Sequence, residues 1–276
     1  GGAVRDGLLN QLKNKPDLDF VVKSNAIKLA HELSNRLGGN CVILDEDRDI
    51  ARWACKGWTI DFAKQIGDTL LDDLSRRDFS INSISLIFNN GPELFDPIGG
   101  ITDLRAKRLV AISEKNLIDD PLRMLRAYRF MAELNLALDA KTQKQIKYNS
   151  NLLSKVAPER IKYEIQRLIN AVYADIVLPL LKETSLLKPW QKHTNNLLQE
   201  SFDLKEKKTF TNEELAIAMP LYRLVDLLSD KGLLKLCFSK KRIKRCEILR
   251  KWKRKNDGMA FKSLNEVDRY KLHIEL

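Results

Sequence analysis

The apolar and polar positions of the first hundred residues follow two different patterns. Short apolar or β-branched runs predict strands, and they fall at residues 21–22, 41–44, 59–62 and 84–88. Residues 25–37 carry apolar side chains at helical spacing and stop at Gly38 and Gly39, a pair typical of a helix end. A turn at 89–92 followed by the strand-like residues 93–95 predicts a hairpin. This part of the chain is therefore expected to mix strands and helices.

Helical patterns dominate from about residue 119 onward. Pro121 and Pro158 stand where a proline suits the first turn of a helix. Three later prolines are expected to mark breaks between helices, namely Pro179, Pro189 and Pro220. The sequence thus predicts the α+β class, with a small mixed sheet and helices in the first part and helices alone afterwards.

Size and composition are those of an ordinary globular protein. The 276 residues are 44% hydrophobic and 31% charged, which allows one large core or two modest ones. No apolar run approaches the roughly 20 residues of a membrane span, and no signal peptide is evident, so we expect a soluble, cytoplasmic protein. The four cysteines lack zinc-type spacing and the three histidines are scattered, which disfavours a zinc site and a histidine-centred mechanism.

Positive charge is concentrated in residues 231–255. This segment contains twelve Lys or Arg and one acidic residue, Glu247, and the difference of eleven equals the net charge of the chain, +11. Apolar side chains recur there at near-helical spacing, at Ile243, Cys246, Leu249 and Trp252. This spacing predicts an amphipathic helix whose basic face is either simply solvated or binds an RNA backbone. The candidate RNA-binding residues are Lys240, Lys241, Arg242, Lys244 and Arg245.

The first twenty residues carry the groups expected of a site for phosphate and metal. Gly1 and Gly2 let the backbone approach a phosphate, and Arg5 can bind the same phosphate through several donors. Asp17 and Asp19 come directly before a strand-like run, and residues two apart in a strand point to one face. Both carboxylates can therefore hold one pair of divalent cations, which suggests nucleotidyl transfer.

Five motifs occur in an order that is found in one protein family. They are GGAVRD (1–6) with DLD (17–19), RRDFSIN (76–82), DPIGGITDL (96–104), DDPLRMLRAYRF (119–130) and PERIKYE (158–164). In these motifs the chain resembles the class II tRNA nucleotidyltransferases, which share their head and neck with bacterial poly(A) polymerases. The resemblance implies a polymerase β-like nucleotidyltransferase head at 1–115, a helical neck at 116–170 and a helical, tRNA-binding body at 171–276.

The resemblance also implies roles for individual residues of the head. Asp17 and Asp19 would bridge two Mg²⁺ ions, and Asp61, which lies in an apolar run, would supply a third carboxylate. The 3′-hydroxyl of RNA would attack the α-phosphate, and pyrophosphate would leave. Contacts to the triphosphate and the ribose would come from Gly1, Gly2, Arg5, Arg76, Arg77, Asp78 and Asn82.

The motif that begins at Asp119 would select the base. In the family, an acidic residue and an arginine of this motif act as an amino-acid template, and Asp120 and Arg123 stand at those places. Their hydrogen bonds would recognise cytosine. Arg126 and Arg129 follow at three-residue intervals along the predicted helix and would steady the triphosphate or the base. Three residues of the last motif are interpreted as ion-pair partners that stabilise the neck, namely Glu159, Arg160 and Glu164.

A short connection narrows the expected substrate to CTP. Family members that build the whole CCA end carry a flexible loop before the RRD motif, whereas here fourteen residues, 62–75, separate Asp61 from Arg76. This favours the CC-adding branch, in which a separate A-adding enzyme completes the tRNA. The alternatives are a full CCA-adding enzyme that uses CTP and ATP, a poly(A) polymerase, and a non-catalytic RNA-binding protein on a decayed transferase scaffold.

Overall fold

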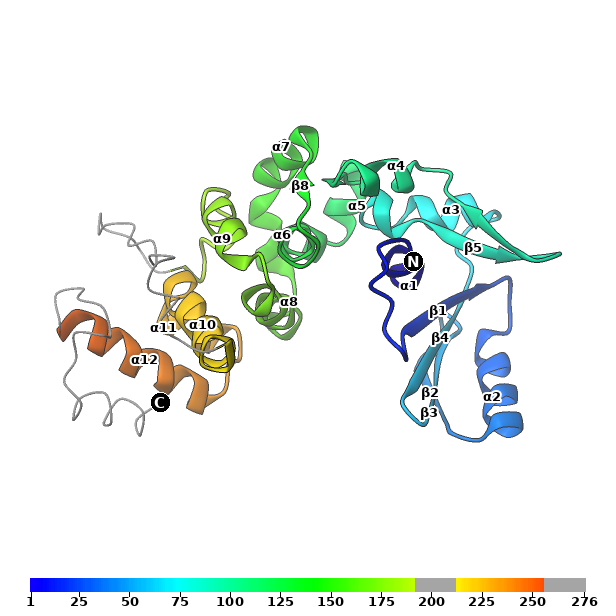
Figure 1. Ribbon diagram of the computed structural model, residues 1–276, viewed down its shortest axis with the longest axis horizontal. Coiled ribbons are helices and arrows are strands. Elements are labelled where there is room, and N and C mark those ends of the chain that lie inside the picture. The colour runs from blue at the N-terminus through cyan, green and yellow to red at the C-terminus, as the bar shows by residue number, and fades with distance from the viewer. Residues whose placement is uncertain (192–211, 256–276) are drawn as a thin grey trace. The chain divides into compact units, whose positions relative to one another are not determined.

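The computed structural model (Figure 1) describes residues 1–191 and 212–255. The chain separates into two compact units, Gly1–Asn116 and Leu117–Leu276. A further boundary near residue 170, between a neck and a body, stays a prediction.

The first unit combines a four-stranded sheet with short helices. Its elements are α1 (Gly2–Leu8), β1 (Asp17–Val22), α2 (Ala26–Leu37), β2 (Asn40–Asp45), β3 (Ile50–Cys55), β4 (Trp58–Lys64), α3 (Leu70–Ser75), η1 (Ser80–Asn82), β5 (Ser85–Phe88), β6 (Pro92–Phe95), α4 (Gly100–Arg105) and β7 (Arg108–Leu109). The sheet has the order β1-β4-β3-β2, in which β1 and β4 are parallel and the other neighbours antiparallel. β5 and β6 form the hairpin that the sequence predicts.

Helix α2 packs against one face of this sheet (Figure 1), and the face turned away from α2 is called the open face. The buried side chains between α2 and the sheet are Ala26, Ala30, Ala51, Trp53 and Phe62. Phe20 stacks on Phe62 with ring centroids 5.7 Å apart, so it belongs to the covered face. Because side chains alternate along a strand, its neighbour Asp19 points to the open face.

The N-terminus of α2 is capped by a side chain from the turn between β2 and β3. Asn25, the residue before the helix, has a left-handed backbone conformation (φ 60°) and makes no side-chain cap. Instead Asp49 accepts hydrogen bonds from the backbone N–H groups of Ile27 (2.8 Å) and Ala26 (3.0 Å). The bond from Ile27, together with the bond from Ala26, lowers the pKa of Asp49 because both favour the charged carboxylate. These bonds fasten α2 to the hairpin of β2 and β3.

Strand β3 is the element of the sheet that the sequence pattern does not reveal. Its residues include two alanines, and Arg52 interrupts the apolar positions, so no run of β-branched residues marks the strand. In the structure Ala51 and Trp53 are buried against α2, while Arg52 lies on the open face. Pairing with β2 and β4 therefore decides the conformation of this segment.

In its described residues, the second unit is built almost entirely of helices. Its elements are α6 (Leu122–Leu134), β8 (Ala137–Leu138), α7 (Ala140–Tyr148), η2 (Ser150–Lys155), α8 (Pro158–Asn170), α9 (Ala174–Lys182), α10 (Asn212–Leu227), α11 (Asp230–Lys235) and α12 (Lys240–Lys255), and α5 (Glu114–Asp119) spans the boundary. The predicted α+β class, a mixed sheet followed by helices, is confirmed. Within residues 1–191 and 212–255, no helix is long and apolar enough to cross a membrane.

Two prolines lie inside helices, where the sequence predicts breaks. Pro179 lies within α9 and Pro220 within α10. A proline removes one backbone hydrogen bond from the interior of a helix. Around Pro179, however, Leu178 and Leu181 are buried, and this packing outweighs the lost bond. Pro189 lies in a run of turns after α9, as predicted.

Candidate active site

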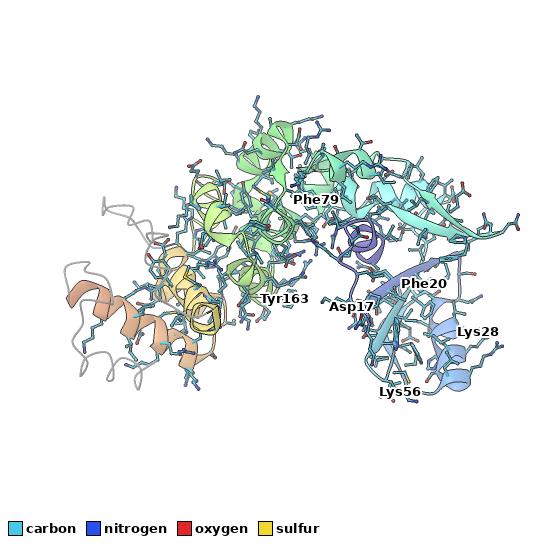
Figure 2. All side chains as sticks on the ribbon, viewed as in Figure 1. Asp17, Phe20, Lys28, Lys56, Phe79 and Tyr163 are labelled. Atoms are coloured by element: carbon cyan, nitrogen blue, oxygen red, sulfur yellow. The ribbon has the colours of Figure 1, made fainter. Side chains whose placement is uncertain are left out.

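A row of charged side chains crosses the open face of the sheet. β1 and β4 pair so that Asp19 lies opposite Asp61, and β3 pairs with β4 so that Arg52 lies opposite Asp61. Asp17 begins β1 (Figure 2), two residues before Asp19 and on the same face. The structure thus brings the three carboxylates that the sequence predicts onto one face of two adjacent strands.

Arg52 is a member of this row that the sequence analysis missed. Its Nε donates a hydrogen bond to Asp61 Oδ1 at 2.7 Å, and its Nη2 donates to Asp61 Oδ2 at 2.8 Å. The hydrogen bond to Asp61 raises the pKa of Arg52. The signal that could have identified Arg52 is its position as the one charged residue in the segment that forms β3.

The carboxyl group of Asp19 lies in a crowded electrostatic environment. Its pKa is raised, first because the surrounding protein desolvates it and then because of the nearby negative charge of Asp61. Arg77 acts in the opposite direction and lowers the pKa of Asp19. A cation bound beside Asp19 would therefore reduce the repulsion between the carboxylates of Asp19 and Asp61.

The donor set of the row suits Mg²⁺. Within the described parts of the chain, no three His, Cys, Asp or Glu side chains converge closely enough to hold a metal ion by themselves. Mg²⁺, however, prefers oxygen ligands and commonly takes one or two carboxylates from a protein, with phosphates and water completing its shell. Asp17 and Asp19, two carboxylates on one strand face, fit this pattern.

Gly1 lies directly beside the row of carboxylates. A Cβ atom at this position would be 3.4 Å from Arg77 Nη1 and 3.6 Å from Asp19 Oδ2, which places Gly1 within van der Waals reach of both groups. Gly2 begins α1, and the N–H of Arg5 donates to the carbonyl of Gly1 at 3.1 Å. The GGAVRD motif therefore forms the start of helix α1.

Arg5 belongs to a buried network that joins α1 to η1. Its Nη1 donates to Asn82 Oδ1 at 2.5 Å, and Asn82 Nδ2 donates to Asp78 Oδ1 at 2.8 Å. All three residues are buried, and Arg5 also pairs with Asp6 at 2.6 Å. The backbone carbonyl of Asn82 accepts a hydrogen bond from Arg77 Nη1 at 3.4 Å, so the network supports Arg77. Direct contact of Arg5, Asp78 or Asn82 with a nucleotide stays a prediction.

The two arginines of the RRD motif differ in exposure. Arg76 is exposed at the C-terminal end of α3. Arg77 is half-buried and pairs with Asp73, one turn earlier, at 3.5 Å. Since Arg77 also lies beside Gly1 and influences Asp19, it is the arginine of this motif that the structure brings to the row.

The connection before these arginines is short in the structure as well. Residues 65–69 alone separate β4 from α3. Thr69 and Asp72 form a capping box at the start of α3, in which each side chain accepts a hydrogen bond from the backbone of the other residue. The chain therefore passes from β4 into α3 with no room for an additional loop.

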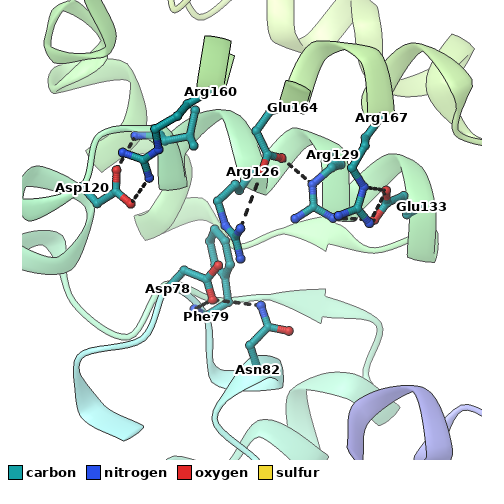
Figure 3. A network of polar contacts seen from close by, with 11 residues as sticks. Asp78, Phe79, Asn82, Asp120, Arg126, Arg129, Glu133, Arg160, Glu164 and Arg167 are labelled. Atoms are coloured by element: carbon teal, nitrogen blue, oxygen red, sulfur yellow. Dashed lines mark hydrogen bonds and ion pairs between the residues drawn. The ribbon is translucent and has the colours of Figure 1, made fainter. Parts of the chain in front are cut away.

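In the second unit, Asp120 is held by a residue of the last motif. Its Oδ2 accepts a hydrogen bond from Arg160 Nη2 at 2.9 Å (Figure 3), and its Oδ1 accepts one from the N–H of Leu122 at 3.3 Å. Arg123 is half-buried in the first turn of α6. Arg160 thus forms an ion pair, as predicted, and its partner is the carboxylate that is predicted to read the base.

Arg129 is buried, and this corrects its predicted role at the nucleotide. It is 1% exposed, and it donates to Glu164 from Nε at 2.5 Å and to Glu133 from Nη1 at 2.6 Å (Figure 3). Arg167 pairs with the same Glu133 at 2.9 Å, and the half-buried Arg126 lies 3.6 Å from Glu164. An α-helix turns about 100° per residue, so steps of three rotate successive arginines around the axis. The third arginine therefore points into the core of the unit.

The basic helix predicted near the C-terminus is α12. Cys246 is fully buried, as its apolar spacing implies, and the side chain of Trp252 lies outside the described residues. Of the candidate RNA-binding residues, those exposed are Lys240, Lys241 and Lys244, and those half-buried are Arg242 and Arg245. Arg250 is buried and forms an ion pair with Asp230, so part of the positive charge of the helix is used internally.

Two family descriptions match the chain in sequence order. Residues 1–110 match the poly(A) polymerase head domain, which includes the sheet and the row of carboxylates. Residues 135–198 match a domain described as the probable RNA- and SrmB-binding site of polymerase A.

The curated relatives include enzymes of three kinds. A CC-adding tRNA nucleotidyltransferase of Synechocystis sp. is 39% identical over 195 residues, 71% of this chain and 47% of the relative. An A-adding tRNA nucleotidyltransferase of Aquifex aeolicus is 37% identical over 189 residues, 62% of this chain and 22% of the relative. A CCA-adding enzyme of Geobacillus stearothermophilus is 31% identical over 197 residues, 67% of this chain and 48% of the relative. The chain spans about half, or less, of the length of these relatives.

Solved structures share the fold of the chain. A tRNA-processing enzyme with CTP has a TM-score of 0.77 and 27% identity, and the match covers 93% of this chain and 74% of that one. A tRNA nucleotidyltransferase complexed with a primer tRNA and an incoming ATP analogue has a TM-score of 0.78 and 26% identity, over 99% of this chain and 85% of that one. With its five ordered motifs and its carboxylate row, the chain belongs to the family of class II tRNA nucleotidyltransferases and poly(A) polymerases.

Proposed function

We propose that the chain is part of a tRNA nucleotidyltransferase that adds cytidines (CC) from CTP to the 3′ end of tRNA and releases pyrophosphate. The observation that carries this proposal is the row of Asp17, Asp19 and Asp61 on the open face of the sheet, beside Gly1 and Arg77. A triphosphate needs a backbone that permits close approach and a nearby positive charge. Gly1 and Arg77 supply both at the edge of the row.

Asp17 and Asp19 would hold Mg²⁺ in this enzyme, with Asp61 as a third carboxylate. When bound, two such ions activate the attacking 3′-hydroxyl and neutralise the leaving pyrophosphate. The protein contributes position, because the parallel register of β1 and β4 sets the carboxylates side by side. Arg76 and Arg77 are the candidates for contact with the phosphates.

Base selection is assigned to Asp120 and Arg123. A carboxylate accepts a hydrogen bond from the amino group of cytosine, and a guanidinium donates to its ring nitrogen and carbonyl. Paired contacts of this kind discriminate between bases by about 1–3 kcal/mol. Arg160 holds Asp120 by an ion pair of 2.9 Å and so keeps the reading carboxylate in one orientation.

The choice of CC addition over full CCA addition depends on the connection between β4 and α3. CC-adding, A-adding and CCA-adding enzymes all occur among the relatives. The family's flexible loop would have to fit within residues 65–69, and this segment is too short for it. A separate A-adding enzyme would then complete the CCA end.

We assign contact with the tRNA backbone to α12. Its exposed lysines are Lys240, Lys241 and Lys244. Each contact with a phosphate releases a counterion and makes binding weaker as salt rises. Recognition through phosphates does not read sequence, which suits an enzyme that must accept many tRNAs.

Nucleotide incorporation tests this proposal. The 276-residue chain is incubated with Mg²⁺ and a tRNA that ends before CCA, with CTP alone, ATP alone or both. We expect two cytidines from CTP and no adenosine under any condition. Asp17→Asn should abolish incorporation, because it removes a metal-binding carboxylate. Asp47→Asn, at an exposed position between β2 and β3, is the matched control and should leave incorporation unchanged.

The other outcomes identify the alternatives. Adenosine added after the two cytidines would identify a CCA-adding enzyme, and polymerisation of ATP without CTP would identify a poly(A) polymerase. A chain that binds tRNA and incorporates neither nucleotide would be an RNA-binding protein on a transferase scaffold.

A further inference from the structure

The ion pair between Arg52 and Asp61 is bidentate, yet it is exposed enough for a cation to compete with Arg52 for the carboxylate. β3 and β4 place the two side chains opposite each other, and the guanidinium donates two hydrogen bonds, of 2.7 and 2.8 Å, to the two carboxylate oxygens. The side chain of Arg52 is 45% exposed and that of Asp61 is 24% exposed. A dissolved cation can therefore reach Asp61 and compete with Arg52 for it.

This pair also bears on why the three carboxylates of the row do not converge on one point. Asp19 and Asp61 are register partners, and the repulsion between them contributes to the raised pKa of Asp19. Nevertheless, in residues 1–191 and 212–255 no three side chains of the metal-binding types converge. β4 lies between β1 and β3, so Arg52 is on the side of Asp61 that faces away from Asp19. The ion pair therefore engages both oxygens of the Asp61 carboxylate from the side of β3.

We propose that Arg52 is a positioning residue for Asp61, which it holds away from Asp19 until a divalent cation displaces the guanidinium. The inference rests on the proposed function, because it requires that the row bind cations. In this arrangement Arg52 neutralises one carboxylate of the empty row and lowers the affinity of the row for a free cation. Asp61 becomes the third ligand when the guanidinium leaves.

An ordinary cross-strand ion pair would have a different consequence. Such a pair contributes to the stability of the sheet, and its removal raises cation affinity only through the lost charge, without Asp61 becoming a ligand. Removal of a competing guanidinium also frees Asp61 to bind the cation. The dependence of the gain in metal affinity on Asp61 therefore separates the two roles.

Binding of Mn²⁺ alone, measured by electron paramagnetic resonance without nucleotide, tests the proposal on the full chain. Arg52→Ala should bind Mn²⁺ on the order of tenfold more tightly than the unsubstituted chain, because a positive charge next to the row is gone. Arg48→Ala is the matched control, since it removes the same charge from a side chain that is 75% exposed in the turn between β2 and β3. Its affinity should change by no more than about twofold, as expected for a screened surface charge.

Two further variants locate the effect. In the Arg52→Ala background, Asp61→Asn should return the Mn²⁺ affinity to near that of the unsubstituted chain, because Asp61 is the ligand that was gained. Arg52→Gln keeps much of the side chain without the charge and should reproduce the tighter binding. Thermal melting of each variant shows whether the sheet is intact.

The failures of the two proposals are distinguishable. If Asp17→Asn removes Mn²⁺ binding but Arg52→Ala and Arg52→Gln bind like Arg48→Ala, the role of Arg52 is overturned while the metal site stands. Weaker binding in both Arg52 variants with unchanged melting would overturn it equally. Absence of Mn²⁺ binding in every variant would overturn the metal site and the role of Arg52 with it.

Discussion

Replacing Glu164 by alanine should destabilise the second unit far more than replacing an exposed acid of the same helix. The side chains of Arg129 and Glu164 are 2% and 3% exposed, and their ion pair is 2.5 Å long. Removal of Glu164 leaves a buried guanidinium with one fewer carboxylate. Breaking a buried pair in this way costs about 3–5 kcal/mol.

The remaining contacts set the expected value within that range. Glu133 still pairs with Arg129 at 2.6 Å, so the guanidinium keeps one partner and we expect the lower end, about 3 kcal/mol. For a unit of this size each kcal/mol shifts the melting temperature by roughly 2–4 °C, which predicts a decrease of roughly 6–12 °C. Circular dichroism during thermal and urea unfolding measures both quantities.

Glu159→Ala is the matched control on α8. Glu159 is exposed in the first turn of this helix, where an acidic residue contributes through the helix dipole alone, so its loss should cost about 0.5 kcal/mol. Equal destabilisation by Glu164→Ala and Glu159→Ala would refute the reasoning from burial.

A double variant then separates structure from nucleotide binding. Arg129→Met with Glu164→Leu replaces the pair by apolar side chains and should recover most of the lost stability, because both buried charges are removed. Glu133 retains Arg167 as a partner. If Arg129 has no contact with the nucleotide, the KM for CTP of this double variant stays near the unsubstituted value. A large rise in KM with restored stability would return Arg129 to the nucleotide site.

Three further outcomes follow from contacts in the two units. Asp49→Ala should cost about 1 kcal/mol at neutral pH, the usual effect of losing a helix cap, as measured by urea unfolding. The pKa of Asp49 in the folded state is lowered from 3.8, so the charged carboxylate stabilises the fold above that pH. This stabilisation is lost as the pH falls through the folded-state pKa. The acid unfolding curve of Asp49→Ala should not show that loss. Gly100→Ala should destabilise the first unit by about 1–3 kcal/mol, because the added methyl group would overlap the backbone carbonyl of Ser80. Its control is Gly7→Ala, which has open space around it and should be neutral or stabilising. Alanine at the three exposed lysines of α12 should weaken tRNA binding and reduce the slope of log affinity against log salt by about 1 per lost contact. The control for this last measurement is the triple substitution of three exposed lysines of α7, namely Lys141, Lys144 and Lys147.

Local patterns predict those parts of the fold that local interactions determine. The apolar spacing and the glycine pair identify α2 to within one residue, and Pro158 occupies the first turn of α8 as expected. The alternation along β1 places Asp17 and Asp19 on one face. In each case the residues that decide the structure are neighbours in sequence, so the pattern is sufficient.

The features that the sequence analysis misses depend on contacts between distant segments. Arg52 acquires its role only when β3 pairs with β4, and nothing within β3 indicates that an aspartate will lie opposite. The spacing of Arg126 and Arg129 is equally compatible with solvent and with a buried partner, and Glu164 on another helix decides between them. The cap of α2 by Asp49 is likewise a contact across the chain.

The position of β1 at the edge of the sheet has a consequence for how the carboxylate row is assembled and lost. β1 pairs with β4 alone, and this parallel ladder can form only after the chain has passed through α2, β2 and β3. β2, β3 and β4 are joined in antiparallel order along the chain and can assemble without it. Contacts between distant segments form late in folding, and edges of a structure open at a lower cost than its centre. We therefore expect Asp17 and Asp19 to be the last groups that folding brings into place and the first that local opening removes, so that heating disrupts the carboxylate row while most of the sheet is still intact.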